Sequence, residues 1–382
     1  ETNIFDMIRE KDLLIHLPYE SFDESVVNFL YSAANDKDVL AIKQTLYRVS
    51  SSSPVVQALE KAVQNGKQVT VLMEVKARFD EANNILMARR LEKAGAHVIY
   101  GLVGLKTHSK CTLVIRREKD GIRRYVHVAT GNYNASTAKL YTDLGILTCN
   151  DRFGIDASAF FNLLSGYSDP PIWDSFIVAP INLRQRCIEL IDREIHFAKN
   201  GEDAHMIAKM NSLLDKGIIE KLYEASQAGV KIELIVRGIC VLIPGIPGVS
   251  DNITVRSIVG RFLEHSRIFW FRNGGREELY ISSADWMPRN LNDRVELMVP
   301  IEDPEIKRRL KQMVDIELSD NQKAHIMQAD GTWLKTISAE NQLCAQEYFQ
   351  KIAEKRDAED EMTLAQKLEP YTPVLGHGDG SD

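Results

Sequence analysis

The sequence predicts an α/β protein of two tandem domains, each a mixed β-sheet flanked by helices, related by internal duplication. Three observations point to this class. The chain has 382 residues, more than the ~100–200 expected of one domain. In each half, apolar β-branched runs alternate with amphipathic stretches and are then followed by several strands in succession. A histidine and an arginine also recur at nearly equal spacing in both halves.

The first half opens with alternating strands and helices and continues with strands alone. Gly66 and Gly95 follow the two amphipathic stretches and are expected to end those helices. The expected elements are strand 38–46, helix 54–64, strand 68–75, helix 80–94 and strands 97–100, 109–116, 124–130 and 144–149.

The second half repeats this order after a helix at 183–199. Asp303 and Pro304 provide an N-cap and a first-turn proline for a closing helix. Helix-prone residues continue at 339–355. The remaining expected elements are strand 205–213, helix 216–228 and strands 231–237, 253–259, 267–271, 279–283 and 295–301.

Two prolines, Pro170 and Pro171, mark the boundary because neither can continue a helix or a central strand. We therefore expect a first domain at 1–170, a second at 171–337 and a C-terminal region at 338–382. That last region combines a helix with an acidic tail that lacks apolar residues, so the tail is expected to be disordered.

Composition restricts the class of protein. Hydrophobic residues make up 44% and charged residues 26%, as in ordinary globular proteins. No apolar run approaches the ~20 residues of a membrane span, and no signal peptide opens the sequence. The five cysteines are scattered and never form a Cys-x-x-Cys pair, which argues against disulfides and structural zinc. A cytoplasmic location, with peripheral contact to the inner membrane left open, is expected.

Charge is unevenly distributed along the chain. The formal net charge is −7, yet residues 105–124 carry seven basic and two acidic residues, and residues 256–276 carry five arginines and one glutamate. Residues 355–382 carry three basic and seven acidic residues. A single charged run is usually a solvated face, but both basic runs surround a repeated histidine. The local potential therefore favours an anionic ligand.

Two histidines are the leading catalytic candidates. His108 precedes Lys110 by two positions, and His265 precedes Arg267 by two positions. Side chains two apart on a strand share a face, so each basic group is expected beside its imidazole. His108 is also expected at an exposed sheet edge. A neutral imidazole can attack phosphorus and store the phosphoryl group, whereas His265 could act as acid or base or hold phosphate oxygens.

Three arginines close hydrophobic strands. Arg78 lies 30 residues before His108, Arg237 lies 28 residues before His265, and Arg48 ends the first strand. A single strand-end arginine usually reaches solvent, but three at equivalent ends favour anion binding, because a guanidinium matches two phosphate oxygens. Tyr141 can be a core aromatic or face the ligand. The sequence contains neither a Walker-type nor a kinase-type glycine loop.

Seven ordered motifs together resemble the bacterial polyphosphate kinase family of the long-chain-synthesising type. The similarity runs from about the first residue to the closing helix and covers the two C-terminal catalytic domains. It implies that the family's N-terminal and helical domains are missing, so we expect a fragment of a longer chain. The motifs occupy residues 42–48, 75–80, 106–110, 130–134, 140–143, 236–240 and 262–265.

The resemblance implies a phospholipase D-like fold for both domains, with departures from its His-x-Lys-x4-Asp motif. The Asp position holds Ile115 in the first copy and Arg272 in the second, and Arg267 replaces the second lysine. These departures count against phosphodiester hydrolysis and agree with the kinase branch.

The resemblance also implies roles for individual residues of this sequence that match functional positions of the family. His108 matches the phosphorylated histidine, and Tyr141, Arg237 and His265 match residues that contact ATP. Arg48 and Arg78 match positions associated with Mg²⁺. A guanidinium has no lone pair for a cation, so these two are expected to hold phosphate oxygens beside the metal.

The resemblance therefore implies an enzyme that reversibly transfers the γ-phosphate of ATP to inorganic polyphosphate through phosphohistidine, and forms ATP from ADP in reverse. Mg²⁺ is the expected cofactor, and ATP, ADP and polyphosphate are the expected partners, with no nucleic acid. The full-length enzyme is expected to be a homo-oligomer. Two alternatives stay open: a phospholipase D-like phosphodiester hydrolase, and a polyanion-binding fragment without turnover.

Overall fold

The computed structural model describes residues 3–166, 169 and 171–358. Its first half is built on a mixed sheet in which β2, β3 and β4 run parallel and the other neighbours antiparallel. In order across the sheet, its strands are β1 (Leu13–Leu17), β8 (Tyr141–Thr148), β7 (Gly121–Ala129), β6 (Lys110–Glu118), β2 (Val39–Leu46), β3 (Gln68–Met73) and β4 (His97–Ile99).

Helices cover both faces of this sheet. Buried residues of α1 (Ile4–Glu10), α2 (Asn28–Asn35), α3 (Pro54–Gln64) and α4 (Glu81–Ala94) share one core with the strands. The opposite face is covered by α5 (Asp151–Leu164). Local sequence sets the ends of these helices. Ser53 caps α3 by accepting from the Val56 amide, and Gly95 ends α4 with a φ of 107° that other residues rarely adopt.

The second half repeats the arrangement on a larger mixed sheet. Helices α6 (Leu183–Lys199) and α7 (Lys216–Ala228) cover one face, and α9 (Pro304–Ser319) covers the other. The strands in order are β18 (Trp333–Lys335), β17 (Ala324–Met327), β12 (Ile253–Ile258), β11 (Lys231–Val236), β10 (His205–Met210), β14 (Ile268–Phe271), β15 (Glu278–Ser282) and β16 (Arg294–Pro300), with β9 (Ile177–Ala179) beside β16. Shorter elements are α8 (Pro288–Asn292), η1 (Asp23–Val27), η2 (Thr137–Lys139) and η3 (Asn273–Gly275).

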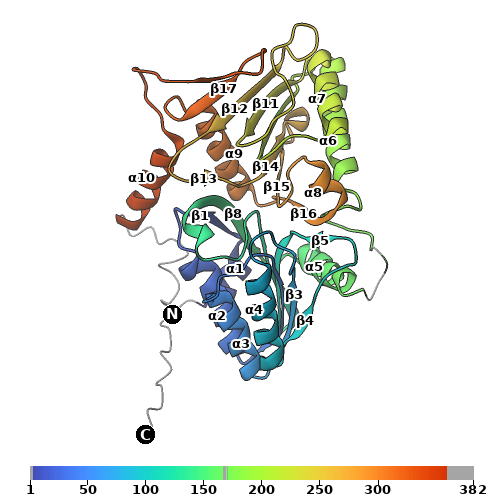
Figure 1. The fold of residues 1–382 in the computed structure, drawn as a ribbon, viewed down its shortest axis with the longest axis vertical. Coiled ribbons are helices and arrows are strands. Elements are labelled where there is room, and N and C mark those ends of the chain that lie inside the picture. Colours follow the sequence, from blue (N-terminus) through green and yellow to red (C-terminus); the bar gives the residue numbers. More distant parts are fainter. Residues whose placement is uncertain (1–2, 167–168, 170, 359–382) are drawn as a thin grey trace.

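Each half lends a two-residue strand to the sheet of the other (Figure 1). In the first half, β5 (Lys106–Thr107) pairs with β16, so that Thr107 lies opposite Val295. In the second half, β13 (Leu263–Glu264) pairs with β8. Both exchanged strands run directly into a repeated histidine, so the exchange fixes where those histidines lie.

The two halves also share a hydrophobic core. Phe160 of α5 is fully buried in a cluster that joins residues of the first sheet, such as Val126, to residues of the second, such as Leu297. The C-terminal helix α10 (Ala345–Ala358) adds Phe349 to this cluster and lies beside α9 at the junction in Figure 1. The halves are therefore packed face to face around common side chains.

The predicted strands and helices are largely found where expected. The helices at 54–64, 183–199 and 216–228 have the predicted bounds, and the closing helix begins after Asp303. The C-terminal helix begins at Ala345 rather than 339, and the expected disordered tail lies outside the described residues. The prediction missed α5, although it carries Phe160, and it missed both exchanged strands.

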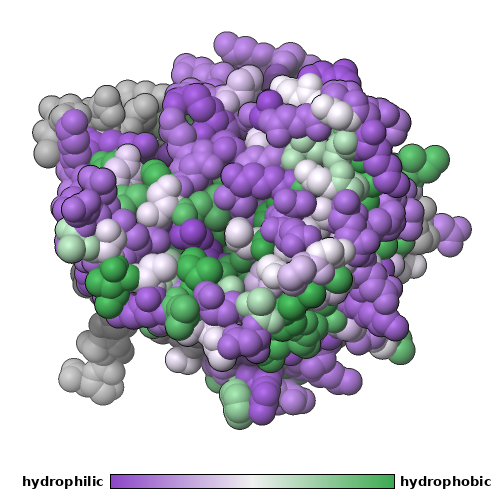
Figure 2. Space-filling model, turned by 90° about the horizontal axis from the view of Figure 1, so that it is seen from above, coloured by the Kyte–Doolittle hydropathy of each residue, from purple (hydrophilic) through white to green (hydrophobic). Residues whose placement is uncertain are grey.

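None of the helices in the described part of the chain is both long and apolar enough to cross a membrane. Seen from above, the second half has a mostly hydrophilic surface, on which apolar side chains gather in small groups (Figure 2).

Replacing Phe160 with alanine tests the shared core. The change should lower the free energy of unfolding by about 3–5 kcal/mol, because it removes a fully buried ring. Ile155 lies on the same helix but is 57% exposed, so Ile155→Ala should stay within about 0.5 kcal/mol of the parent. Urea denaturation of both variants measures the difference. Equal destabilisation would show that α5 does not join the halves.

Candidate active site

His108 lies at the junction of the two halves. It follows β5, and its backbone amide donates to the Val295 carbonyl of the second half at 3.0 Å. His108 is only 6% exposed. The expectation of an exposed sheet edge was therefore wrong, because β5 leaves its own sheet to pair with β16, and the second half covers the histidine.

The ring of His108 is held from both sides. Its Nδ1 lies 2.8 Å and 2.9 Å from the carboxylate oxygens of Glu296. Ser283 and Asn290 donate to that carboxylate in turn. On the other side, Lys110 Nζ lies 3.1 Å from Nε2. A carboxylate accepts and an ammonium donates, so the proton belongs on Nδ1 and the lone pair on Nε2.

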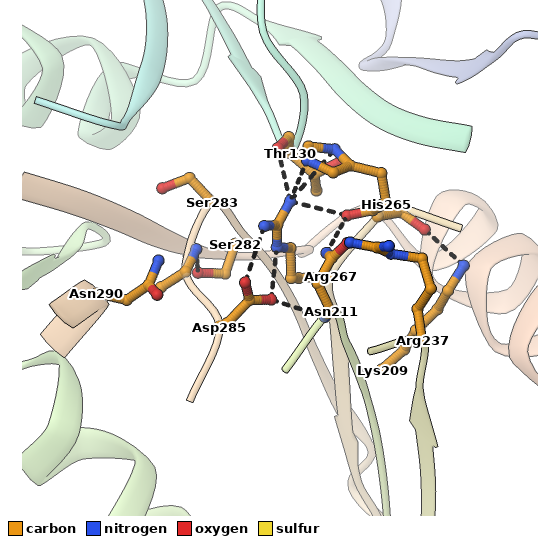
Figure 3. Close-up of polar contacts among 12 residues, drawn as sticks. Thr130, Lys209, Asn211, Arg237, His265, Arg267, Ser282, Ser283, Asp285 and Asn290 are labelled. Carbon is orange, nitrogen blue, oxygen red and sulfur yellow. Dashed lines mark hydrogen bonds and ion pairs between the residues drawn. The ribbon is translucent and has the colours of Figure 1, made fainter. Parts of the chain in front are cut away.

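His265 has the same arrangement with the halves interchanged. Its Nδ1 lies 2.8 Å from Asp143 Oδ1, and its backbone amide donates to the Thr142 carbonyl of the first half at 3.3 Å. Arg267 lies between His265 and Asp285 (Figure 3), with Nη1 3.2 Å from His265 Nε2 and Nε 3.0 Å from Asp285 Oδ1. Arg267 thus occupies the position that Lys110 has beside His108.

The carboxylates that orient the two histidines are crossed between the halves. Asp143 is the third residue of β8 and faces the histidine of the second half, while Glu296 is the third residue of β16 and faces the histidine of the first. Thr130 donates to Asp143 at 2.7 Å. A Cβ at Gly131 would lie 2.1 Å from Asp143 Oδ2, so glycine there leaves room for the carboxylate.

Burial and neighbouring charge shift the pKa values of these groups. Burial, followed by Lys110, Arg294, Arg267 and His265, lowers the pKa of His108 well below its usual value, so its imidazole is neutral. His265 is among the groups that lower the pKa of His108, so the two histidines interact electrostatically. Burial lowers the pKa of Lys110 to about 7 and raises that of Glu296 to about 7. Burial outweighs Asp143 and lowers the pKa of His265.

Two of the predicted nucleotide-contacting residues lie beside His265. The ring of Tyr141 is centred 5.2 Å from the imidazole of His265. Arg237 is half-buried, and its Nε donates to Asn211 Oδ1 at 2.8 Å. Asn211 in turn donates to the His265 carbonyl at 3.0 Å. Arg237 and Tyr141 therefore form the wall of the centre on the side of His265.

The two predicted magnesium-associated arginines are placed differently. Arg48 packs over Tyr47, whose ring meets the imidazole of His108 edge-on at 5.0 Å, and Arg48 pairs with Asp80 at 3.3 Å. Arg78 is exposed and lies over the Phe79 ring. Arg48 thus reaches the centre through one aromatic ring, while Arg78 faces solvent.

Sequence reasoning missed the residues that orient the site. Glu296, Asp143 and Asp285 were not predicted, because all three lie outside the His-x-Lys-x4-Asp motif. A usable signal was present, since Asp143 lies 35 residues after His108 and Glu296 lies 31 residues after His265. This similar spacing indicates that the two acids occupy equivalent positions. It does not indicate that each one binds the histidine of the opposite half.

Family models match both halves of the chain. Residues 3–170 match the model described as polyphosphate kinase C-terminal domain 1, and residues 176–346 match polyphosphate kinase C-terminal domain 2.

Curated relatives agree with these models. A polyphosphate kinase of Halalkalibacterium halodurans is 60% identical over 324 residues, which make up 85% of this chain and 46% of the relative. One from Synechocystis is 55% identical over 356 residues, 92% of this chain and 49% of the relative. The chain thus spans about half the length of these proteins.

Solved structures extend the likeness to the fold. The crystal structure of polyphosphate kinase from Porphyromonas gingivalis superimposes with a TM-score of 0.87 at 39% identity, over 94% of this chain and 55% of that one. Phosphatidylserine synthase of Haemophilus influenzae gives a TM-score of 0.52 at 12% identity, over 93% of this chain and 95% of that one, a likeness of fold alone. The two halves are tandem phospholipase D-like domains, as predicted.

The crossed carboxylates can be tested on the free protein. Asp143→Asn should lower the pKa of His265 further, because the carboxylate raises it and the amide cannot. Nitrogen-15 NMR of labelled imidazoles against pH measures the shift. Asp120→Asn serves as the control because Asp120 is exposed and pairs with Arg123. An unchanged His265 titration in Asp143→Asn would mean that the two groups do not interact.

Proposed function

Because this chain belongs to the polyphosphate kinase family and carries both of its C-terminal domains, we propose that it holds the phosphoryl-transfer centre of such an enzyme. The enzyme moves the γ-phosphate of ATP to inorganic polyphosphate and back. One observation carries the proposal. The neutral imidazole of His108 is fixed at Nδ1 by Glu296 and has its Nε2 lone pair beside Lys110.

Transfer proceeds in two displacements at phosphorus. In the first, Nε2 of His108 attacks the γ-phosphorus, the N–P bond forms, and the bond to the bridging oxygen breaks and releases ADP. The Nδ1 proton remains shared with Glu296, whose carboxylate stabilises the positive charge that develops on the ring. In the second, the terminal oxygen of polyphosphate attacks the same phosphorus and the N–P bond breaks. Reversal of these steps makes ATP from ADP.

The surrounding cations neutralise the charge of the transferred group. Phosphoryl transfer depends mainly on placement and charge stabilisation, and guanidinium groups match pairs of phosphate oxygens. Lys110 and Arg267 lie within the centre, and we assign them to the transferred phosphoryl group. We assign Tyr141, Arg237 and His265 to the nucleotide. The ring of Tyr141 packs against the imidazole of His265, whose Nε2 lies beside Arg267. Arg48 and Arg78 are assigned to phosphate oxygens farther out.

Magnesium is proposed as part of the substrate. Among residues 3–358 as described, no group of three or more His, Cys, Asp or Glu side chains is arranged to hold a metal ion. Arg48 and Arg78 have no lone pair to offer one. This donor set does not fit a resident metal site, and Mg²⁺ usually binds nucleotide phosphates with several waters. We therefore assign Mg²⁺ to the incoming nucleotide and Arg48 and Arg78 to its phosphates.

Isotope labelling tests the nucleophile. Incubation of the complete protein with γ-labelled ATP should give an acid-labile, base-stable label that His108→Ala abolishes, because the variant lacks the attacking nitrogen. His97→Ala is the matched control, since that histidine is exposed on β4. Label that persists in His108→Ala would reject the assignment, and cleavage of a phosphodiester without ATP would favour the hydrolase alternative.

The pH dependence tests Lys110 and Glu296. Plotted against pH, kcat/KM should be bell-shaped around pH 7, because each group has a pKa of about 7. Below this pH Glu296 gains a proton and no longer supports a charged imidazole. Above it Lys110 loses its proton and its charge.

Lys110→Arg separates the two limbs of that profile. Arginine stays protonated, so the alkaline limb should move to higher pH while the acid limb stays in place, although the rate itself falls. Lys106→Arg is the control, because Lys106 is exposed on β5. An alkaline limb that does not move in Lys110→Arg would show that another group causes it.

A further inference from the structure

Glu264, the residue directly before His265, is the centre of a buried polar cluster. It is only 3% exposed, and its carboxylate contacts a different set of residues from the imidazole of its neighbour. That imidazole lies beside Asp143 and Arg267. A buried carboxylate is costly unless it is hydrogen-bonded, so the partners of Glu264 help to determine where this segment lies.

The partners of Glu264 come from three different parts of the molecule. Thr142 of β8, in the first half, donates to Glu264 Oε2 at 2.8 Å. Lys209 of β10, in the second half, donates to the same oxygen at 2.6 Å. Gln346 of α10 donates to Glu264 Oε1 at 2.8 Å. Glu264 therefore joins β13 to both halves and to the C-terminal helix at one point.

Lys209 neutralises this carboxylate and also contacts the residue on the other side of His265. It is buried and donates to Ser266 Oγ at 2.8 Å. Glu317 of α9 is a second carboxylate, 2.9 Å from the ammonium. Burial opposes the charge of Lys209, but Glu264 and Glu317 outweigh it and raise the pKa of Lys209 above its usual value. The ammonium therefore stays charged, and it binds residues on both sides of the histidine.

Gln346 also binds the backbone next to β13. Its Nε2 donates to the Phe262 carbonyl at 2.9 Å, and its Oε1 accepts from the Phe262 amide at 3.0 Å. Gly260 leaves room for this contact, because a Cβ there would lie 2.5 Å from Gln346 Oε1. The side-chain amide thus pairs with both backbone groups of Phe262, as a neighbouring strand would.

Backbone pairing alone holds β13 weakly. This strand has two residues, whereas an ordinary strand has about five. Leu263 donates to the Leu140 carbonyl at 2.9 Å, but the His265 amide lies 3.3 Å from the Thr142 carbonyl, a long hydrogen bond. The imidazole of His265 nevertheless lies 2.8 Å from Asp143, which requires a well-placed backbone. Side chains must supply part of that placement.

We propose that Glu264 and Gln346 are positioning residues for His265, with Lys209 as the counterion of Glu264. Together they hold β13 against β8, and this places the imidazole beside Asp143. The placement is a property of the protein without substrate. Its effect on ATP rests on the proposed function, in which His265 contacts the nucleotide.

Exchange of an imidazole proton with water tests the placement without ATP. In the complete protein with nitrogen-15-labelled histidines, Gln346→Met should speed exchange of the His265 Nδ1 proton by about tenfold, because it keeps the size of the side chain but removes its hydrogen bonds. The Nδ1 proton of His108 should exchange at the parental rate. Gln350→Met, one turn along the same helix, is the control and should leave both rates unchanged.

Either of two results would overturn this role of Gln346. One is an unchanged rate at His265 in Gln346→Met. The other is equal acceleration at His108 and His265, which would mean that the variant loosens the whole junction and not β13 in particular.

Glu264→Gln tests the carboxylate. It keeps the size of the side chain, but its amide would face either Lys209 or Gln346, and both of these are donors. Exchange at His265 should therefore rise by about tenfold. Glu347→Gln, exposed on α10, should leave the rate unchanged. Parental exchange in Glu264→Gln would reject Glu264 as a positioning residue.

Gly260→Ala tests the contact with Phe262 without changing Gln346 itself. The added methyl group would displace the amide, so exchange at His265 should again become faster. Gly217→Ala is the control, because a Cβ there would make only an ordinary contact of 3.5 Å with Asp215. An unaltered rate in Gly260→Ala would contradict the contribution of this contact.

Turnover separates this inference from the proposed function. In Gln346→Met the KM for ATP should rise about tenfold while kcat changes by less than about twofold, because His265 is assigned to nucleotide binding. Gln350→Met should keep both values. Faster exchange at His265 with a parental KM would disprove the effect on ATP. If the parent shows no phosphoryl transfer while exchange at His265 still depends on Gln346, the proposed function fails and the placement stands.

Discussion

Each half of this protein supplies the hydrogen bond that orients the histidine of the other. Glu296 holds His108 and Asp143 holds His265, and the two-residue strands β5 and β13 bring each histidine across the junction. An imidazole with a fixed Nδ1 proton has one nitrogen left for chemistry, so the carboxylate decides which atom can react. The chemistry of the centre therefore depends on the packing of the two halves more than on either half alone.

Burial in the low-polarity interior is the main cause of the pKa shifts in this centre. The same burial that keeps His108 neutral brings the pKa values of Lys110 and Glu296 to about 7. A buried charge is costly unless it is paired, and Lys110 has the His108 imidazole beside it while Arg267 has Asp285. The shared core around Phe160 packs the two halves against each other, and the crossed pairs depend on that packing.

The sequence predicted the positions of helices and strands better than it predicted which strands pair and which residues contact the histidines. Helices such as α3 and α7 have capping side chains and apolar faces, so their bounds could be read directly. Strands β5 and β13 have two residues each, too few for an alternating pattern, and their pairing depends on tertiary contacts. For the same reason His108 was wrongly expected at an exposed edge. The repeated histidines and basic residues were visible, whereas the assignment of Glu296 and Asp143 to opposite halves requires knowledge of how the sheets meet.

The glycine at position 131 determines whether the carboxylate of Asp143 fits in its place. A single methyl group there would collide with the carboxylate of Asp143, which lies 2.8 Å from His265 Nδ1. Exchange of glycine for alanine would thus force that carboxylate away from the second histidine. A relative with any larger residue at this position would need another way to orient its second histidine.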